Sequence, residues 1–66
     1  MSESITGIEL QLVGEDGNAF SILGKASKAL KRNDLYDEYW KDYESEATSG
    51  DYNNLLVTTM KYFDVI

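Results

Sequence analysis

The hydrophobic and polar positions of this chain change period once, which divides it into a strand-like start and a helical remainder. Between residues 8 and 12 apolar and polar residues alternate, so Ile8, Leu10 and Leu12 share one face of a half-buried strand. From Ala19 the apolar residues recur at helical spacing, which predicts an amphipathic helix. The apolar stripe of that helix consists of Ala19, Ile22, Leu23, Ala26 and Leu30.

Two further helices are predicted, each after a group of turn-forming residues. Asn33-Asp34 is a natural break before a helix over residues 34–47, and a second break, TSGD, follows at residues 48–51. Ser49 is the expected N-cap of the third helix. The predicted buried face of that helix consists of Tyr52, Leu55, Leu56, Met60 and Phe63.

The closing residues 62–66 are rich in strand formers. They could pair with the first strand, and a frayed helix end is the alternative. The predicted fold is therefore α+β: one small domain over residues 1–66 in the order β-α-α-α, with a short C-terminal strand pairing with the first. Residues 1–4 are expected to be flexible.

Composition limits the chemistry of this small chain. Its 66 residues include no cysteine and no histidine, which removes disulfides, thiolate zinc sites and the commonest general base. We therefore expect no metal, no cofactor and no enzyme. Twelve acidic against six basic residues give a net charge of −6, which argues against direct binding to nucleic acid. No run approaches the roughly 20 apolar residues of a membrane span, and the first residues lack an export signal, so we expect a cytoplasmic protein.

The segment GEDGNAF, residues 14–20, lies where a strand gives way to a helix, a place that often holds a phosphate-binding loop. Its pattern lacks the third glycine of a dinucleotide fingerprint and the Gly-Lys-Ser/Thr of a P-loop. The simpler interpretation is a turn and a cap. In that interpretation Gly14 and Gly17 can supply positive φ angles, and Asp16 or Asn18 can cap the helix.

If the helices pack antiparallel, the second glycine turn lies at the same end of the molecule as the first. That arrangement gives an alternative function, an oligomeric sponge that binds a nucleotide-like molecule between the two turns. The candidate ligand-binding residues are Gly14, Asp16, Gly17, Asn18, Ser49, Gly50, Asp51 and Tyr52.

The second helix pairs a Tyr/Trp stripe with many carboxylates, since seven acids and a single lysine lie between residues 34 and 51. Aromatic residues are favoured interface anchors, and acids steer basic partners. One interpretation is thus a protein-docking surface formed by Tyr36, Asp37, Trp40, Tyr43 and Glu44. The alternatives are an aromatic core with a solvated acidic face, or mimicry of nucleic acid by the carboxylates.

The segments QLVGEDGNAFSILGKASKALKR and EATSGDYNNLLVTTMKYFDV resemble a group of small proteins of phages and other mobile elements. The shared pattern covers about residues 8 to 65 and keeps both glycine turns in order. The resemblance implies a phage-type accessory protein that inhibits or redirects a host protein in the host cytoplasm. It brings no established activity with it. A structural or assembly component, forming a homo-oligomer, is a further alternative.

Overall fold

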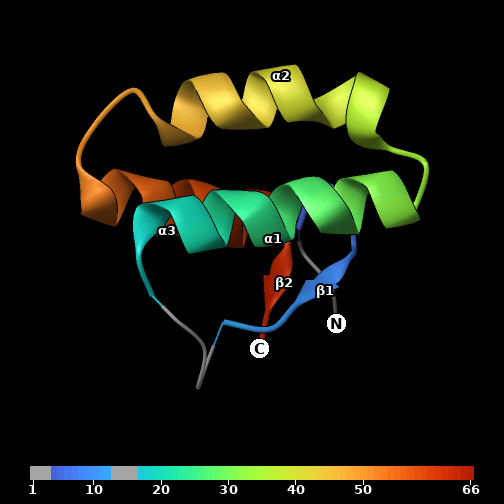
Figure 1. Ribbon diagram of the computed structural model, residues 1–66, viewed down its shortest axis with the longest axis horizontal. Coiled ribbons are helices and arrows are strands. Elements are labelled where there is room, and N and C mark those ends of the chain that lie inside the picture. Colours follow the sequence, from blue (N-terminus) through green and yellow to red (C-terminus); the bar gives the residue numbers. More distant parts are fainter. Residues whose placement is uncertain (1–3, 13–16) are drawn as a thin grey trace.

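The computed structural model describes residues 4–12 and 17–66, and within them the predicted α+β order is confirmed (Figure 1). The C-terminal strand is present, so the alternative of a frayed helix end is wrong. The elements in chain order are β1 (Glu9–Leu10), α1 (Ala19–Arg32), α2 (Tyr36–Ala47), α3 (Tyr52–Tyr62) and β2 (Asp64–Val65).

The two strands lie at opposite ends of the chain and pair in parallel, Glu9 with Asp64 and Leu10 with Val65. The Leu12 amide extends the ladder by donating to the Ile66 carbonyl at 2.9 Å. Parallel strands require a long crossover connection, and here all three helices form it. Residues 1–3 lie outside the described part, so their predicted flexibility stays a prediction, whereas the Ser4 hydroxyl accepts a hydrogen bond from the Gly7 amide.

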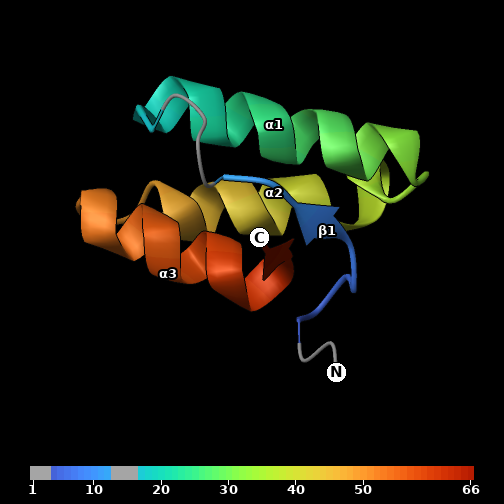
Figure 2. The ribbon, with the colours of Figure 1, turned by 90° about the horizontal axis from the view of Figure 1, so that it is seen from below.

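All three helices lie on one side of the sheet (Figures 1 and 2). Helices α1 and α3 lie side by side, and α2 lies over both of them, on the side away from the strands (Figures 1 and 2). The outer face of α2 is therefore exposed along its length, while its inner face closes the core. This placement decides which of its aromatic residues can meet another molecule.

The centre of the core is Tyr43 of α2, which is 0% exposed. Its ring makes edge-to-face contacts with Tyr62 and Phe63, each at 5.5 Å between centroids. Its hydroxyl lies 2.8 Å from that of Thr59, which itself donates to the Leu55 carbonyl. Because the Thr59 proton is used in that bond, the Tyr43 hydroxyl is the donor, and this buried polar pair is satisfied.

The predicted buried face of α3 is wrong at two positions. Met60 is 56% exposed and Tyr52 is also exposed, whereas Thr58 and Thr59 are buried with Leu55. Threonine side chains can be buried when their hydroxyl groups have hydrogen-bond partners inside the protein. A prediction that uses only apolar residues therefore misplaces part of the core-facing side of this helix. In α1 the stripe is nearly as predicted: Ala19 is exposed, Leu23 is half-buried, and Ala29 joins the buried side.

The helix ends confirm one predicted cap and correct another. The Asn18 side chain accepts from the Ser21 amide at 2.8 Å, as expected for the start of α1. The N-cap of α3 is Asp51, which accepts from the Asn54 amide at 2.9 Å. Ser49 instead donates its hydroxyl to the Glu46 carbonyl at the end of α2.

Helix α2 begins at Tyr36, two residues after the predicted start. Asp34 has a φ of 62°, which lies in the left-handed region and is incompatible with a right-handed helix. The carboxylate of Asp34 therefore belongs to the turn between α1 and α2.

Candidate functional site

The two glycine turns meet at one end of the molecule, as the antiparallel arrangement predicts. The Tyr52 hydroxyl, at the start of α3, donates a hydrogen bond to the Gly17 carbonyl, just before α1. Ser49 and Gly50 approach the same end from the α2–α3 turn. Gly14 and Asp16 lie outside the described residues.

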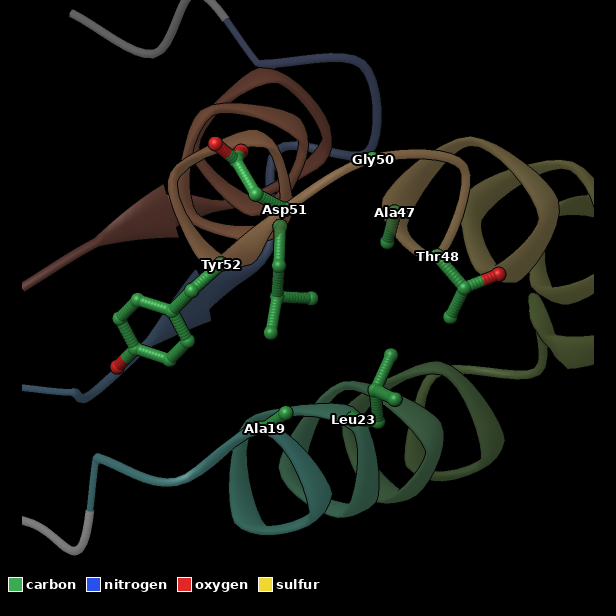
Figure 3. A pocket seen from close by; sticks show the side chains of 8 residues that line it. Ala19, Leu23, Ala47, Thr48, Gly50, Asp51 and Tyr52 are labelled. Carbon is green, nitrogen blue, oxygen red and sulfur yellow. The ribbon is translucent and has the colours of Figure 1, made fainter.

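A pocket of about 280 Å³ opens between these turns (Figure 3). Its walls come from the start of α1, the end of α2 and the start of α3. Leu23 points into the pocket, whereas the Asp51 carboxylate and the Tyr52 hydroxyl are directed away from it. We call it the corner pocket; its lining residues are Ala19, Leu23, Ala47, Thr48, Gly50, Asp51, Tyr52 and Leu55.

The chemistry of the corner pocket does not favour phosphate. Both helix N-termini at this end are capped from within the chain, by the side chains of Asn18 and Asp51. An anion would compete for amides that already have acceptors, and the Asp51 carboxylate would repel it. A surface built mostly of carbon suits an apolar group instead, which weakens the nucleotide alternative at these residues.

The second candidate site lies on α2, and the structure corrects one of its five predicted residues. Tyr43 is a core residue with no exposed surface, so it cannot contact a partner. Helical spacing puts Tyr36, Trp40 and Tyr43 on one stripe of α2. Tyr43, in the middle of the helix, is covered by Tyr62 and Phe63, whereas Tyr36 and Trp40, nearer its start, stay half-buried. The remaining four residues, which we call the α2 flank, are Tyr36, Asp37, Trp40 and Glu44.

The α2 flank combines aromatic rings with carboxylates. Asp37 and Glu44 are exposed, and Tyr36 and Trp40 are half-buried. The rings of Tyr36 and Trp40 stack at 5.5 Å between centroids with an interplanar angle of 13°. From α1, the Lys31 ammonium lies 4.8 Å above the Tyr36 ring. The surface therefore already holds one cation over an aromatic face, an interaction that a partner's lysine or arginine could reproduce.

A shallow hollow of about 240 Å³ extends this surface toward the α1–α2 turn, and its walls include Lys31, Asp34 and Asp37. Sequence reasoning missed Lys31 and Asp34 as members of this site. Lys31 precedes Tyr36 by five residues, but they meet only because the left-handed turn at Asp34 folds α2 back over α1. The only hint in the sequence is the charged residue Asp34 within the predicted helix break, which could have suggested that this turn belongs to the site.

The opposite side of α2 is engaged within the fold. Glu46 accepts from the Lys61 ammonium of α3 at 2.9 Å, and this carboxylate raises the pKa of Lys61. The Glu46 carbonyl also accepts from the Asn54 side chain at 2.8 Å. The acids of α2 thus differ in role: Glu46 joins α2 to α3, while Asp37 and Glu44 face solvent.

Comparison with protein-family models, with curated protein sequences and with solved structures found no match. Within residues 4–12 and 17–66, no group of three or more carboxylates gathers closely enough to hold a metal ion. No helix in this part of the chain is both long and apolar enough to cross a membrane.

Proposed function

We propose that this chain is a non-enzymatic binding protein that docks on a basic surface of a host protein through the α2 flank. The observation that carries the proposal is the half-exposed Tyr36–Trp40 stack, bordered by the carboxylates of Asp37 and Glu44. The resemblance to phage accessory proteins supplies the host context. Inhibition or redirection of that host protein, in the host cytoplasm, is the corresponding role.

The arrangement of the flank suits recognition of a lysine- or arginine-bearing partner. Tyrosine and tryptophan are enriched at the centres of protein interfaces, where their rings supply large contact areas. Asp37 and Glu44 lie seven residues apart, about 10 Å along the helix, with Trp40 between them. Two partner cations could therefore pair with the carboxylates while an apolar group covers the rings.

The overall charge of the chain also favours a basic partner. A net charge of −6 on 66 residues attracts basic surfaces over distances up to about a Debye length and raises association rates. We expect binding to weaken with increasing salt. Carboxylates alone would give only this long-range electrostatic attraction. The aromatic stack adds a local contribution to the binding free energy that does not depend on salt.

The test compares two double charge reversals on the same helix. In Asp37→Lys/Glu44→Lys the carboxylates of the α2 flank are replaced; in the matched control, Glu38→Lys/Asp42→Lys, two exposed acids on the other side of α2 are replaced. Each variant exchanges two carboxylates for two ammonium groups, and each removes one acid from the first helical turn. Circular dichroism checks that both variants fold.

The measurement has two stages: capture of a stoichiometric partner from host lysate by the wild type, then titration calorimetry with the purified partner. We expect the flank variant to lose at least tenfold in affinity, with the control within about threefold of the wild type. Equal losses in both variants would show that only net charge matters. Full retention of the partner by the flank variant would place the interface elsewhere.

A further inference from the structure

The first turn of α1 carries an aromatic side chain that the fold leaves uncovered. Phe20 is 89% exposed, more than any other large apolar side chain in the described chain. It directly follows Ala19, which forms part of the wall of the corner pocket. A phenylalanine ring has 150–250 Å² of surface to bury. The ring is therefore available for contact with another molecule at the same end of α1 as the pocket.

The corner pocket has the size and chemistry to receive such a ring. Its volume is about 280 Å³, and an apolar cavity of about 150 Å³ is already large enough to bind benzene. Leu23 and Leu55 supply aliphatic wall, and the polar ends of Asp51 and Tyr52 point elsewhere. The Phe20 ring of the same chain lies outside this space, because its exposed fraction leaves almost no buried area.

We propose that the corner pocket binds Phe20 of a second copy of this chain, and that Phe20 of the first copy enters the pocket of the second. Phe20 and the pocket residue Ala19 are adjacent in the first turn of α1, so ring and pocket belong to the same end of the molecule. In the proposed dimer a two-fold axis at that end sets each ring opposite the other copy's pocket. Reciprocal contacts of this kind define an isologous dimer. The partner copy thereby completes a site that one chain leaves open.

The dimer goes beyond the proposed docking function and does not depend on it. Tyr36 and Asp37 lie at the opposite end of α2 from Ala47 and Thr48, which line the pocket. Two copies joined at their corner pockets therefore keep the hollow beside Tyr36 accessible on each. Such a dimer could engage two basic surfaces at once.

Electrostatics gives the dimer a distinctive salt dependence. Each copy carries a net charge of −6, so association brings like charges together. Screening by salt weakens this repulsion and leaves the apolar contact in place. Dimerisation should therefore strengthen between low and high salt, which is opposite to the salt dependence expected for docking on a basic partner.

Analytical ultracentrifugation of the full chain tests the proposal with three variants. Phe20→Ser removes the ring, and Ala19→Leu fills the mouth of the pocket; both positions are exposed in the single chain, so the fold should persist. The control, Val57→Ser, removes another exposed apolar side chain, on α3. We expect a concentration-dependent wild-type dimer, a dissociation constant raised at least tenfold by Phe20→Ser and by Ala19→Leu, and little change for Val57→Ser.

Mixing the two disruptive variants sharpens the result. Phe20→Ser keeps an open pocket and Ala19→Leu keeps the ring, so the mixture should regain a heterodimer through one contact, visible by native mass spectrometry. A wild type that stays monomeric up to millimolar concentration and in high salt would overturn the proposal, as would a mixture without heterodimer. Equal weakening by Val57→Ser would also overturn it, because the association would then be non-specific. If the corner pocket were covered only when a host protein is bound, and not by a second copy, the proposal would also fail.

Discussion

The aromatic cluster around Tyr43 and the corner pocket are both apolar, yet they differ in how completely they are filled. Around Tyr43, the rings of Tyr62 and Phe63 meet edge to face, and the buried hydroxyl has its partner in Thr59. At the corner pocket, helices α1 and α3 leave about 280 Å³ open, and Phe20 remains outside.

The difference separates stability from binding within one small domain. A chain of this size buries only about 60% of the surface that it exposes when unfolded, so its stability must depend strongly on the well-packed cluster. The corner contributes less to the fold and therefore has surface available for another molecule. Substitutions at the two places should accordingly affect different measurements.

The largest expected effect is that of Tyr43→Ala. Loss of a fully buried aromatic side chain typically costs about 3–5 kcal/mol, which is much of the stability that a small domain possesses. We expect urea denaturation to show a mostly unfolded or strongly destabilised chain. The comparison is Phe20→Ala, which should change the free energy of unfolding of the monomer by less than about 0.5 kcal/mol. A similar loss from both substitutions would contradict the contrast between cluster and corner.

A smaller effect is expected at the start of α3, where Asp51 caps the helix beside the corner pocket. Replacement of an N-cap by alanine costs about 0.5–2 kcal/mol, so Asp51→Ala should lower the midpoint of urea denaturation measurably. Ser49→Ala is the matched control, since the Ser49 hydroxyl donates to a carbonyl at the end of α2. Should Ser49→Ala cost more than Asp51→Ala, the assignment of the cap would be wrong.

The smallest effect is a loss of stability in alkali that originates in the cluster. Burial raises the pKa of Tyr43 and of Tyr62 above that of a free tyrosine, about 10. The folded chain therefore holds these protons more tightly than the unfolded chain. The stability that this provides is fully present below about pH 10 and is lost as the pH rises through the raised pKa values.

Thermal unfolding between pH 8 and pH 11 measures this loss. The wild-type Tm should fall above about pH 10. Tyr43→Phe should start from a lower Tm at pH 8, because it lacks the hydrogen bond to Thr59, worth about 1 kcal/mol, but its further fall in alkali should be smaller. If Tm fell by the same amount in alkali in both proteins, deprotonation of Tyr43 would not be coupled to unfolding.

Much of the fold follows from local patterns along the chain. The alternation over residues 8–12, the helical spacing after Ala19 and the two turn groups correctly predicted the order of the first strand and the three helices. Asn18, the cap of α1, was one of the two predicted candidates, with Asp16 as the other. The meeting of the two glycine turns followed from short connections between antiparallel helices. The site was less predictable, because Tyr43 lies on the same stripe as Tyr36 and Trp40 and differs from them in being covered by Tyr62 and Phe63, which are distant in sequence.

The sequence by itself determined the first strand, the three helices and their order, since these depend on the spacing of apolar residues and on residues that break helices. It left a C-terminal strand and a frayed helix end as alternatives. Only the tertiary structure decided which tyrosines are core, that Thr58 and Thr59 are buried, that residues 9–10 and 64–65 pair in parallel, and that Phe20 is exposed. The physical reason is that burial of a hydroxyl or exposure of a ring depends on partners distant in sequence. Thr59 can enter the core because α2 brings the Tyr43 hydroxyl to it, sixteen residues away.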